Sequence, residues 1–573
     1  MLIPSVDWKI DDDKNICQFG GYLSNNVNIF EHLIKESPAN IVSKGTFEND
    51  TTINMVNHMG KVPYRINNFV LDSLLSMNVN TDLLELKLHS DTSKMETFES
   101  NKEYGNIELI KSHNSRYHNN LAIISVAKLY RNIDNFYYPF FMDWRGRLYV
   151  KGGPLNFQAG ELSRSLLLFS NGCKLDSDGL TALKLYCANA YGLDKLSLTN
   201  RINWVDSNIE GIINCNTKSE LFINADERFT FLACCNELKC YLKDPDNHIC
   251  RLPIYLDATC NGLQHLSAMI KDYELGSKVN LLASSVDDKP SDLYSLMIDP
   301  IKTGIEELVA KNTDFSRLLN LNINRSLVKR SLMTISYGVT KKGVFDKLMD
   351  EHFIYSHKAG KINFYKSVDQ SVSTNVFTSS DIYQLGCVIY DSLYKVHPNL
   401  VGLVKYFNKI VELFNDLNLP VFWSPPSGLR VGQKYIKFVT SSITTKILGK
   451  TKKINLNVPD KNVLNKRKQV NAFVPNFIHS MDASYLAMIV NQIYKYYPTI
   501  SILNVHDCFG TTADNVKIIR YLVISTFIDI YSDSNFLDDF HNNIINYLTT
   551  HVDGVVVDNY KVIKEYGDDD YKK

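Results

Sequence analysis

The sequence predicts an α+β fold that is predominantly helical, and two observations support this prediction. Apolar residues recur at helical spacing through residues 291–350 and 381–417. Short β-type runs stand apart from these segments, and the clearest is an apolar run at 500–505, followed by a His506-Asp507 turn and a second run. With 573 residues, the chain has room for several domains or for one large enzyme with several lobes.

Composition excludes several broad classes of protein. Hydrophobic residues make up 45% of the chain and charged residues 22%, so the chain as a whole is not expected to be disordered. Apolar runs stay shorter than about 18 residues, so no membrane-spanning helix is expected. The 62 basic and 62 acidic residues balance, which argues against a small DNA-coating protein but leaves room for a local basic channel in a large enzyme.

The cysteines favour a reducing compartment. Eleven are present without a Cys-x-x-Cys pair, which predicts reduced and partly buried thiols. They are densest between Cys234 and Cys260, but they lack the spacing of common zinc sites there. We therefore expect no metal in that stretch.

The N-terminal half is expected to alternate between helices, loops and one β-type stretch. Residues 52–77 have helical apolar spacing, whereas residues 78–118 are polar and are expected to form a long loop. A helix is expected at 119–134 and an aromatic, β-type stretch at 137–150. Residues 172–247 then mix helical patterns with Asn-rich turns.

The C-terminal half begins with an apolar strand at 252–256 that leads into a helix at 262–271. A strand-rich segment surrounds Gly428. Residues 446–468 carry a net charge of +7, because eight basic residues stand against Asp460. The basic residues are Lys446, Lys450, Lys452, Lys453, Lys461, Lys466, Arg467 and Lys468. The tail at 567–573 is expected to fray.

Three segments place charged groups at the ends of predicted elements. Asp257 ends the strand at 252–256, where a carboxylate is costly unless it is paired or bound to a metal; taken alone, it reads as a helix N-cap. Arg325 and Lys329 lie four residues apart on one helix face, which taken alone is a solvated basic surface. Asp507 lies in the predicted hairpin turn, where an aspartate is common.

Together, the three segments predict nucleotidyl transfer. Two carboxylates at strand ends could hold two divalent ions about 3.5–4 Å apart for an in-line phosphoryl displacement. Arg325 and Lys329 could hold a triphosphate whose leaving pyrophosphate develops charge, and Tyr337 beside Gly338 is suited to packing on a base or a sugar. Mg²⁺ is the expected ion, because it binds through one or two carboxylates together with substrate phosphates.

Five runs in this sequence resemble the motifs of the single-subunit RNA polymerases of bacteriophages, mitochondria, chloroplasts and organellar plasmids. They occur in the order and with the spacing of that family, at 141–147, 253–265, 325–338, 475–480 and 505–511. Weaker matches at Gly20-Gly21-Tyr22 and at 64–67 extend the similarity almost to the first residue. The resemblance therefore covers nearly the whole chain.

The resemblance implies specific roles for residues of this chain. Asp257 and Asp507 would bind two Mg²⁺ ions together with the Ala258 carbonyl, and Lys329 would be the third catalytic residue. The nucleotide-binding residues would be Arg325, Lys329, Arg330, Tyr337, His479 and, as a weaker candidate, Lys195. The residues that bind nucleic acid would be Asp143, Arg145, Gly146, Arg147, Gly338, Lys450, Lys452, Lys453, Lys466, Arg467 and Lys468. Gly262 and His506 would support the site.

Two alternatives stay open at this point. DNA polymerases of the same fold family carry a Glu where this chain has Gly262, and His-Asp-Glu where it has His506-Asp507-Cys508, so both positions favour ribonucleotides. His479 offers a ring nitrogen to the 2′-hydroxyl of such a substrate. The other alternative is a degenerate chain that binds nucleic acid without catalysis. Lys342, where relatives commonly carry an aromatic residue, and Ala258, where they usually have Gly, depart from the family pattern.

The resemblance also implies an architecture, that of a right-hand polymerase with an antiparallel palm sheet. We expect an N-terminal remnant at 1–47, since most of the N-terminal domain of the family is absent before Asp143, and a helical thumb at 48–133. The remaining divisions are palm at 134–171, 248–273 and 480–573, a palm insertion at 172–247, and fingers at 274–479 with a basic hairpin at about 446–470.

The same resemblance implies partners and a location. A DNA template, nascent RNA and NTPs are the expected partners, and a need for initiation factors is left open. We expect a monomer that does not bind a membrane. The mitochondrion is the expected location, with an organellar plasmid or the cytoplasm of a phage-infected cell as alternatives.

Overall fold

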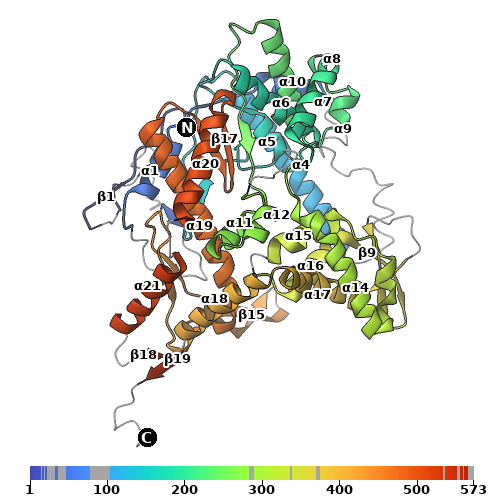
Figure 1. Ribbon diagram of the computed structural model, residues 1–573, viewed down its shortest axis with the longest axis vertical. Helices are drawn as coiled ribbons and strands as arrows, with labels where there is room; N and C mark the ends of the chain where they lie inside the picture. Colours follow the sequence, from blue (N-terminus) through green and yellow to red (C-terminus); the bar gives the residue numbers. More distant parts are fainter. Residues whose placement is uncertain are drawn as a thin grey trace, which may run out of the picture.

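A computed structural model describes residues 1–13, 16–18, 20–21, 33–35, 47–77, 104–282, 289–335, 338–368, 375–447, 450–532, 536–551, 555–558 and 561–564. The fold is α+β and mostly helical, as predicted. Helix α19 (Lys466–Tyr496) is its centre, and helices from distant parts of the sequence pack against it (Figure 1). They are α1 (Thr51–Met59), α11 (Asn261–Met269), α18 (Pro398–Asp416) and α20 (Val516–Tyr531).

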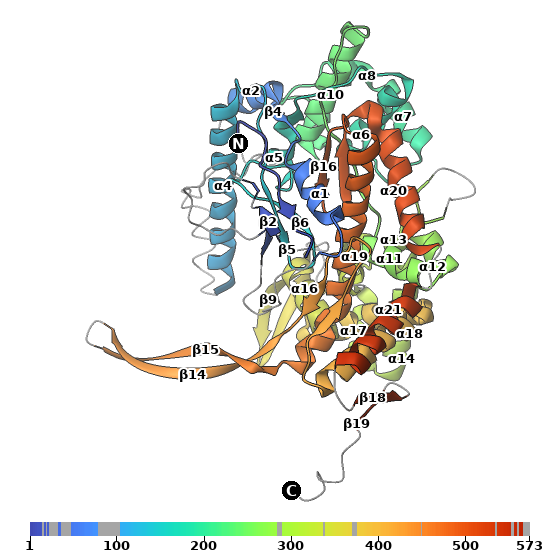
Figure 2. The ribbon, with the colours of Figure 1, turned by 90° about the vertical axis from the view of Figure 1, so that its left-hand side faces the viewer.

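One group of helices lies above the middle of α19 in Figure 2 and confirms the mixture of helices and turns expected at 172–247. The group comprises α5 (Glu161–Ser165), α6 (Ser177–Tyr191), α7 (Leu198–Ser207), α8 (Ile209–Ile213), α9 (Glu220–Asn224) and α10 (Arg228–Lys243). Polar N-caps define several of these helices, as Asp176 does for α6 by accepting a hydrogen bond from the Gly179 N–H. Helix α6 ends at Gly192, whose φ of 111° suits glycine.

A second group of helices lies mostly below the middle of α19 in Figure 2 and, apart from its first member, corresponds to the helical patterns read at 291–350 and 381–417. It comprises α12 (Tyr273–Lys278), α13 (Leu293–Leu296), α14 (Ile298–Lys311), η2 (Thr313–Asn320), α15 (Arg325–Ile335), α16 (Lys341–His352) and α17 (Ser379–Val396). A capping box between Thr378 and Asp381 begins α17.

Gly338 closes α15 and fits closely against α19. The Val339 N–H donates to the Thr334 carbonyl and the Gly338 N–H to the Ile335 carbonyl, which is the Schellman pattern with Gly338 at φ 71°. A Cβ atom on Gly338 would lie 3.4 Å from the Pro475 ring and 3.5 Å from the Asn471 carbonyl oxygen. Pro475 cannot donate a hydrogen bond to that carbonyl, so the close approach falls where α19 lacks one backbone hydrogen bond.

The central sheet is antiparallel and has the strand order β16-β17-β8. It contains β16 (Ile502–Val505), β17 (Cys508–Thr511) and β8 (Ile254–Leu256), which confirms the strand–turn–strand and the apolar strand expected from the sequence. A second sheet joins β5 (Phe140–Asp143) to β6 (Leu148–Val150) and, in parallel, to β3 (Ile34–Lys35).

The remaining strands form small sheets at the periphery. They are β1 (Lys9–Ile10) with β2 (Ile16–Gln18); β4 (Tyr64–Ile66) with β7 (Leu167–Phe169); β9 (Phe353–Ala359), β10 (Ile362–Ser367) and β11 (Phe377–Thr378); β12 (Val421–Trp423) with β13 (Val431–Gln433); and β18 (Val555–Asp558) with β19 (Lys561–Lys564).

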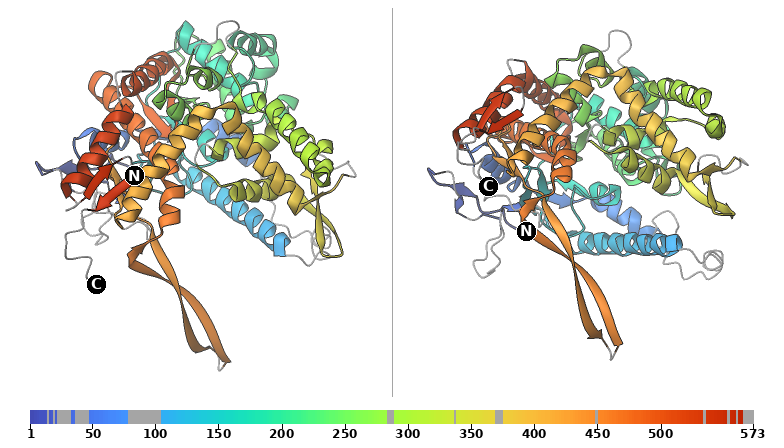
Figure 3. Two further views of the ribbon diagram at one scale, coloured as in Figure 1. Left: turned by 60° about the horizontal axis from the view of Figure 1, so that its bottom comes forward. Right: turned by 90° about the horizontal axis from the view of Figure 1, so that it is seen from below.

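A long two-stranded ribbon projects from the body of the molecule (Figures 2 and 3). It consists of β14 (Ile436–Ile447) and β15 (Lys450–Leu464), so it begins ten residues before the expected position 446. It also ends earlier than expected, because Lys466, Arg467 and Lys468 form the first turn of α19 rather than part of the hairpin. The Asn465 side chain starts that helix by accepting from the Lys468 N–H.

The N-terminal half differs from the sequence expectation in two places. The segment 52–77 contains two helices, α1 and α2 (Asn68–Ser76), because β4 separates them. Helix α4 (Tyr104–Tyr130) begins inside the stretch expected to be a loop, of which 78–103 lies outside the described residues. Within the described residues, none of the helices is both long and apolar enough to cross a membrane. The tail at 567–573 also lies outside them, and the last described helix is α21 (Phe536–His551).

Candidate active site

The central sheet brings Asp257 and Asp507 to the same end of neighbouring strands. Leu256 pairs with Phe509 between β8 and β17, so Asp257 continues β8 beside Cys508. Val505 pairs with Cys508 across the β16–β17 hairpin, which leaves His506 and Asp507 as its two turn residues. His506 has a φ of 58°, a conformation that glycine usually supplies at the first position of such a turn.

The two carboxylates repel each other in a partly desolvated place. Burial, together with the nearby charges of Asp257 and Asp482, raises the pKa of Asp507 to about 7. Burial also raises the pKa of Asp257. A hydrogen bond from the Ala258 N–H and the positive charges of Arg164 and Lys329 lower it in part. The Asp257 side chain remains in contact with solvent, so a ligand can reach it.

The carboxylate pair fits a divalent cation. At neutral pH the pair holds a proton about half of the time, given the pKa of about 7 at Asp507, and a cation would replace that proton and remove the repulsion. Carboxylate oxygens with access to water are the ligands that Mg²⁺ prefers, and the carbonyl of Ala258 follows Asp257 directly. Cys508 is buried beside both carboxylates. Burial is the largest cause of the raised pKa of its thiol, and the charges of Asp257 and Asp507 add to it.

The turn between β5 and β6 carries the predicted residues Asp143, Arg145, Gly146 and Arg147. Asp143 Oδ1 accepts from the Arg145 and Arg147 N–H groups, and its Oδ2 accepts from the Arg145 guanidinium at 2.6 and 3.0 Å. Gly146 has a φ of 94°, and a Cβ there would lie 2.9 Å from Leu429. The turn is therefore fixed by its own carboxylate and by glycine.

Asp482, which the sequence reading did not single out, fixes Arg147. The carboxylate is buried on α19 and accepts from the Arg147 guanidinium through both oxygens, one of them at 3.1 Å from Nε. Asn261 donates to the same carboxylate at 3.3 Å. A bidentate pair of this kind is directional and holds its two elements in one arrangement. It joins the 143–147 turn to α19 and to the start of α11, next to Asp257.

His479 is held as a neutral ring beside this turn. The Arg145 guanidinium donates to His479 Nδ1 at 2.8 Å, so the neutral ring carries its proton on Nε2. Burial, Arg147 and Arg145 lower the pKa of His479 to about 2. Burial and Arg147 likewise lower the pKa of His506 to about 4, and Tyr149 packs edge-on against that ring at 5.1 Å.

Helix α15 directs its basic residues in different directions. Lys329 is exposed and close enough to Asp257 to lower the pKa of that carboxyl. Arg325 is paired through Nε with Asp292 at 2.6 Å and lies over the Tyr294 ring at 5.5 Å. Lys195 also acts on Asp292, although its ammonium pairs with Asp194. A triphosphate that binds Arg325 would use its remaining guanidinium N–H groups or replace Asp292 at Nε.

Arg330 faces elsewhere, because its guanidinium pairs with Glu351 on α16. Gly262 is buried in the first turn of α11. Lys342 pairs with Asp346 at 2.8 Å and lies 4.1 Å from the Phe345 ring. Tyr337, Tyr22 and the side chain of Lys450 lie outside the described residues.

Other functional candidates were not found from the sequence. Arg164 lies near Asp257, pairs with Glu227 at 3.0 Å and lies over the Tyr255 ring. Gln158 donates to the carbonyls of Leu148 and Asn504, and so ties the two sheets together. The residues around Arg164 and Gln158 in the sequence form no motif that indicates a functional role. Only the folded structure shows that Arg164 lies near Asp257 and that Gln158 joins the two sheets.

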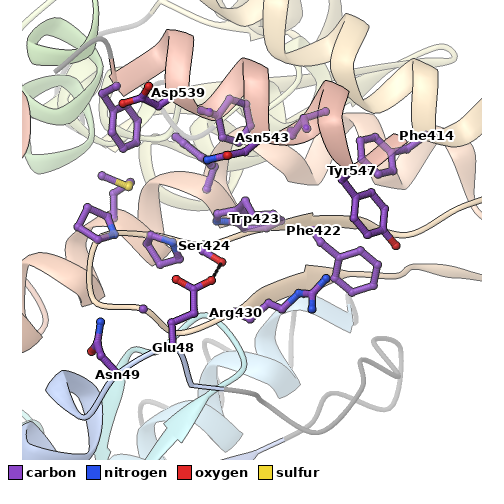
Figure 4. A pocket seen from close by; sticks show the side chains of 18 residues that line it. Glu48, Asn49, Phe414, Phe422, Trp423, Ser424, Arg430, Asp539, Asn543 and Tyr547 are labelled. Carbon is purple, nitrogen blue, oxygen red and sulfur yellow. Dashed lines mark hydrogen bonds between the residues drawn. The ribbon is translucent and has the colours of Figure 1, made fainter. Parts of the chain in front are cut away.

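A separate pocket of about 600 Å³ lies away from the carboxylates, between α21, α18, β12 and the N-terminal segment (Figure 4). Aromatic side chains that include Trp423, Phe422 and Tyr547 line it. Ser424 closes one side by donating to Glu48 at 2.6 Å. None of the residues proposed from the sequence lines this pocket.

Comparison with known proteins gives a consistent result. The family model described as DNA-dependent RNA polymerase matches residues 173–570. A probable DNA-directed RNA polymerase of Neurospora crassa is 42% identical over 554 residues, which cover 95% of this chain and 61% of that protein. A mitochondrial DNA-directed RNA polymerase of the same species is 30% identical over 74% of this chain and 33% of its own length.

A chloroplastic/mitochondrial DNA-directed RNA polymerase 2 of Arabidopsis thaliana is also similar, with 28% identity over 73% of this chain and 41% of its own length. The chain spans between 48% and 61% of the length of four fungal relatives that it matches.

Proposed function

The chain belongs to the single-subunit family of DNA-dependent RNA polymerases, and from this premise we propose that it extends RNA on a DNA template. The observation that carries the proposal is the pairing of Asp257 and Asp507 at one end of the central sheet, where the charge of Lys329 on α15 acts on Asp257. Carboxylates that repel each other beside a cation are suited to binding metal ions and a triphosphate together.

Mg²⁺ is the metal that we propose for this pair. When bound, two such ions lower the pKa of the RNA 3′-hydroxyl and stabilise the charge that develops during phosphoryl transfer. Asp257 and Asp507 would hold the ions, and the Ala258 carbonyl would add a ligand. Lys329 would contact the triphosphate and stabilise the charge on the leaving pyrophosphate. Arg325 would contact the same phosphates through guanidinium N–H groups other than the Nε–H that Asp292 accepts, while Lys195 and Arg330 are weaker candidates.

Selection of ribonucleotides would depend on three residues. Gly262 provides no side chain that could occupy the space of a 2′-hydroxyl. His479 has its Nδ1 occupied by Arg145, so its Nε2–H would donate to the hydroxyl oxygen. Tyr337 would lie at the sugar and the template base, and we expect Tyr337→Phe to relax the discrimination between NTPs and dNTPs. A mutant that discriminates as sharply as the wild type would contradict that role.

We also propose the right-hand architecture for this chain. The palm would contain the central sheet within 134–171, 248–273 and 480–573, with an insertion at 172–247. The thumb would be 48–133 after a remnant at 1–47, and the fingers would be 274–479. Asp143, Arg145, Gly146 and Arg147 would lie beside the template–RNA hybrid, near Gly338.

The projecting ribbon would contact DNA through the phosphates, with Lys452 and Lys453 exposed on it, and Lys466, Arg467 and Lys468 would extend this surface onto α19. Given the organellar names of two relatives, we propose an organellar location, with the mitochondrion as the first choice.

Primer extension tests the proposal without needing a promoter. A short RNA is annealed to a DNA template, Mg²⁺ is added, and either NTPs or dNTPs are supplied. We expect extension with NTPs that is lost in Asp507→Asn. Extension mainly with dNTPs would instead support a DNA polymerase. No extension by a folded protein that still binds the hybrid would support a degenerate chain.

A further inference from the structure

Three different metal-ligand side chains meet outside the carboxylate site, near the end of α10. The ligand atoms of Glu237, His248 and Cys250 all lie within 4.8 Å of one another. His248 Nε2 is 2.9 Å from the Glu237 Oε2 atom. Cys250 is fully buried, whereas the His248 and Glu237 side chains each keep 12% of their surface exposed.

Local structure explains why these residues converge. After α10 the chain turns, and the His248 N–H donates to the Asp244 carbonyl. The segment that follows is extended and pairs with Cys173 through Cys250. His248 and Cys250 are two residues apart on that segment, so they point to one side, toward Glu237 on the helix. Each of the three residues is therefore held by backbone structure and not only by its contacts with the other two.

Hydrogen bonds link Cys250 to its neighbours. The thiol shares a hydrogen bond with Glu237, and the Leu252 N–H donates to its sulfur. Burial and the Glu237 carboxylate nevertheless hold the pKa of the thiol well above its ordinary value, so the sulfur keeps its proton until a metal replaces it. In the metal-free protein, protons hold Glu237, His248 and Cys250 together; a metal would displace them.

We propose that Glu237, His248 and Cys250 form a binding site for a zinc-type transition metal ion. Nitrogen, sulfur and carboxylate oxygen are the ligands of Zn²⁺, whereas Mg²⁺ prefers oxygen alone. With metal–ligand distances of about 2.0–2.3 Å, the three donors of a tetrahedral site lie about 3.3–3.6 Å apart. The 2.9 Å contact would open slightly, and any separation between that spacing and the 4.8 Å limit would close. The exposed side leaves a fourth position for water.

The sequence reading expected no metal in this stretch, because the cysteines lack paired spacing. That expectation considered the spacing of cysteines alone. Here the single cysteine Cys250 lies beside His248 and Glu237, and Glu237 is eleven residues before His248 in the sequence. The metal would act as a clamp. It would join the end of α10 to the segment that runs through β8 to Asp257.

Co²⁺ binding tests the site directly, since a thiolate ligand gives Co²⁺ a charge-transfer absorption band. The full chain is stripped with a chelator and titrated with Co²⁺ in excess Mg²⁺, which occupies oxygen ligands. We expect a thiolate–Co²⁺ band that saturates at about one equivalent and is displaced by Zn²⁺. The absence of this band in the folded wild-type chain would overturn the proposal.

Three cysteine variants identify the sulfur. Cys250→Ser should lose the band, with binding weakened by at least about 100-fold. Cys240→Ser, at an exposed position on α10, and Cys508→Ser, beside the carboxylates, should keep it. Should Cys250→Ser not fold, His248→Gln replaces it, because that side chain is partly exposed. A band that survives Cys250→Ser or His248→Gln, or that vanishes only with Cys508→Ser, would overturn the site.

Discussion

The carboxylate site and the projecting ribbon use charge in opposite ways. The site concentrates charges of both signs in partly buried contacts, where each group is held by named partners such as Arg147 with Asp482. The ribbon spreads lysines over two strands that solvent reaches along the described side chains of 451–460. Charges in the site therefore depend on exact position, whereas those of the ribbon act as a sum. Substitutions should consequently have large, specific effects in the first region and small, additive ones in the second.

The largest effect is expected at Asp507. Asp507→Asn should reduce RNA extension by at least about 10³-fold, because the neutral amide cannot replace the second carboxylate that binds the metal ions together with Asp257. Primer extension at saturating NTP and Mg²⁺ measures it. Asp529→Asn, at an exposed position on α20, is the matched control and should extend normally. An active Asp507→Asn enzyme would remove the carboxylate pair from the mechanism.

Asp482→Asn should destabilise the fold by about 3–5 kcal/mol, because the Arg147 side chain, which is only 15% exposed, loses its fully buried charged partner. Urea unfolding monitored by circular dichroism measures this loss. The double variant Arg147→Met with Asp482→Leu should recover most of it, since both charges are removed together. If Asp482→Asn is as stable as the wild type, the pair does not anchor the turn at 143–147.

The pH dependence of stability distinguishes the site from the ribbon. The folded pKa of Asp507, about 7, lies above its unfolded value near 3.9, so the folded state binds more protons between these values. Without metal, stability should therefore fall by about 2–4 kcal/mol as the pH rises from 4 to 7.5.

Urea unfolding in chelator at several pH values measures this slope. Asp507→Asn should flatten it, and Mg²⁺ should restore stability at pH 7.5 in the wild type only. A slope that is unchanged in Asp507→Asn would assign the pH dependence to other groups.

The smallest effect is expected on the ribbon. Replacing Lys452 and Lys453 by Glu should weaken DNA binding by about tenfold and make the slope of log K against log salt shallower by about two. Fluorescence anisotropy across a salt series measures both. Lys358 and Lys361 of the β9–β10 hairpin, replaced in the same way, are the control and should leave the slope unchanged. Extension of an annealed primer should persist in both variants.

The sequence predicts local secondary structure around the site but not the contacts between residues that are far apart in the chain. The strand before Asp257 and the hairpin around Asp507 follow from periodicity and turn residues within a few positions. The bond between Arg147 and Asp482 spans 335 residues, and neither residue type nor spacing indicates it. The roles expected for Arg325 and Arg330 came from the family resemblance, with helical spacing as added support for Arg325, and the structure adds their partners Asp292 and Glu351.

Boundaries were the weakest predictions, for the same physical reason. The ribbon was located by the cluster of lysines from Lys446 onward, but its first strand starts at Ile436 and, after Lys437, contains only uncharged residues up to Lys446. Similarly, the start of α4 is polar, and apolar spacing could not reveal it. The cluster of Glu237, His248 and Cys250 was missed because only cysteine spacing was considered.

The ribbon also has a consequence for colloidal behaviour. It is a two-stranded sheet, so each strand has one outer edge that pairs with no other strand of the described chain. Several apolar side chains on it are exposed, with Phe438 at 44% and Val439 at 50%. Edges of this kind invite intermolecular strand addition and aggregation, and lysines are a common protection against it. The same lysines would thus keep the protein dispersed whenever no nucleic acid covers the ribbon.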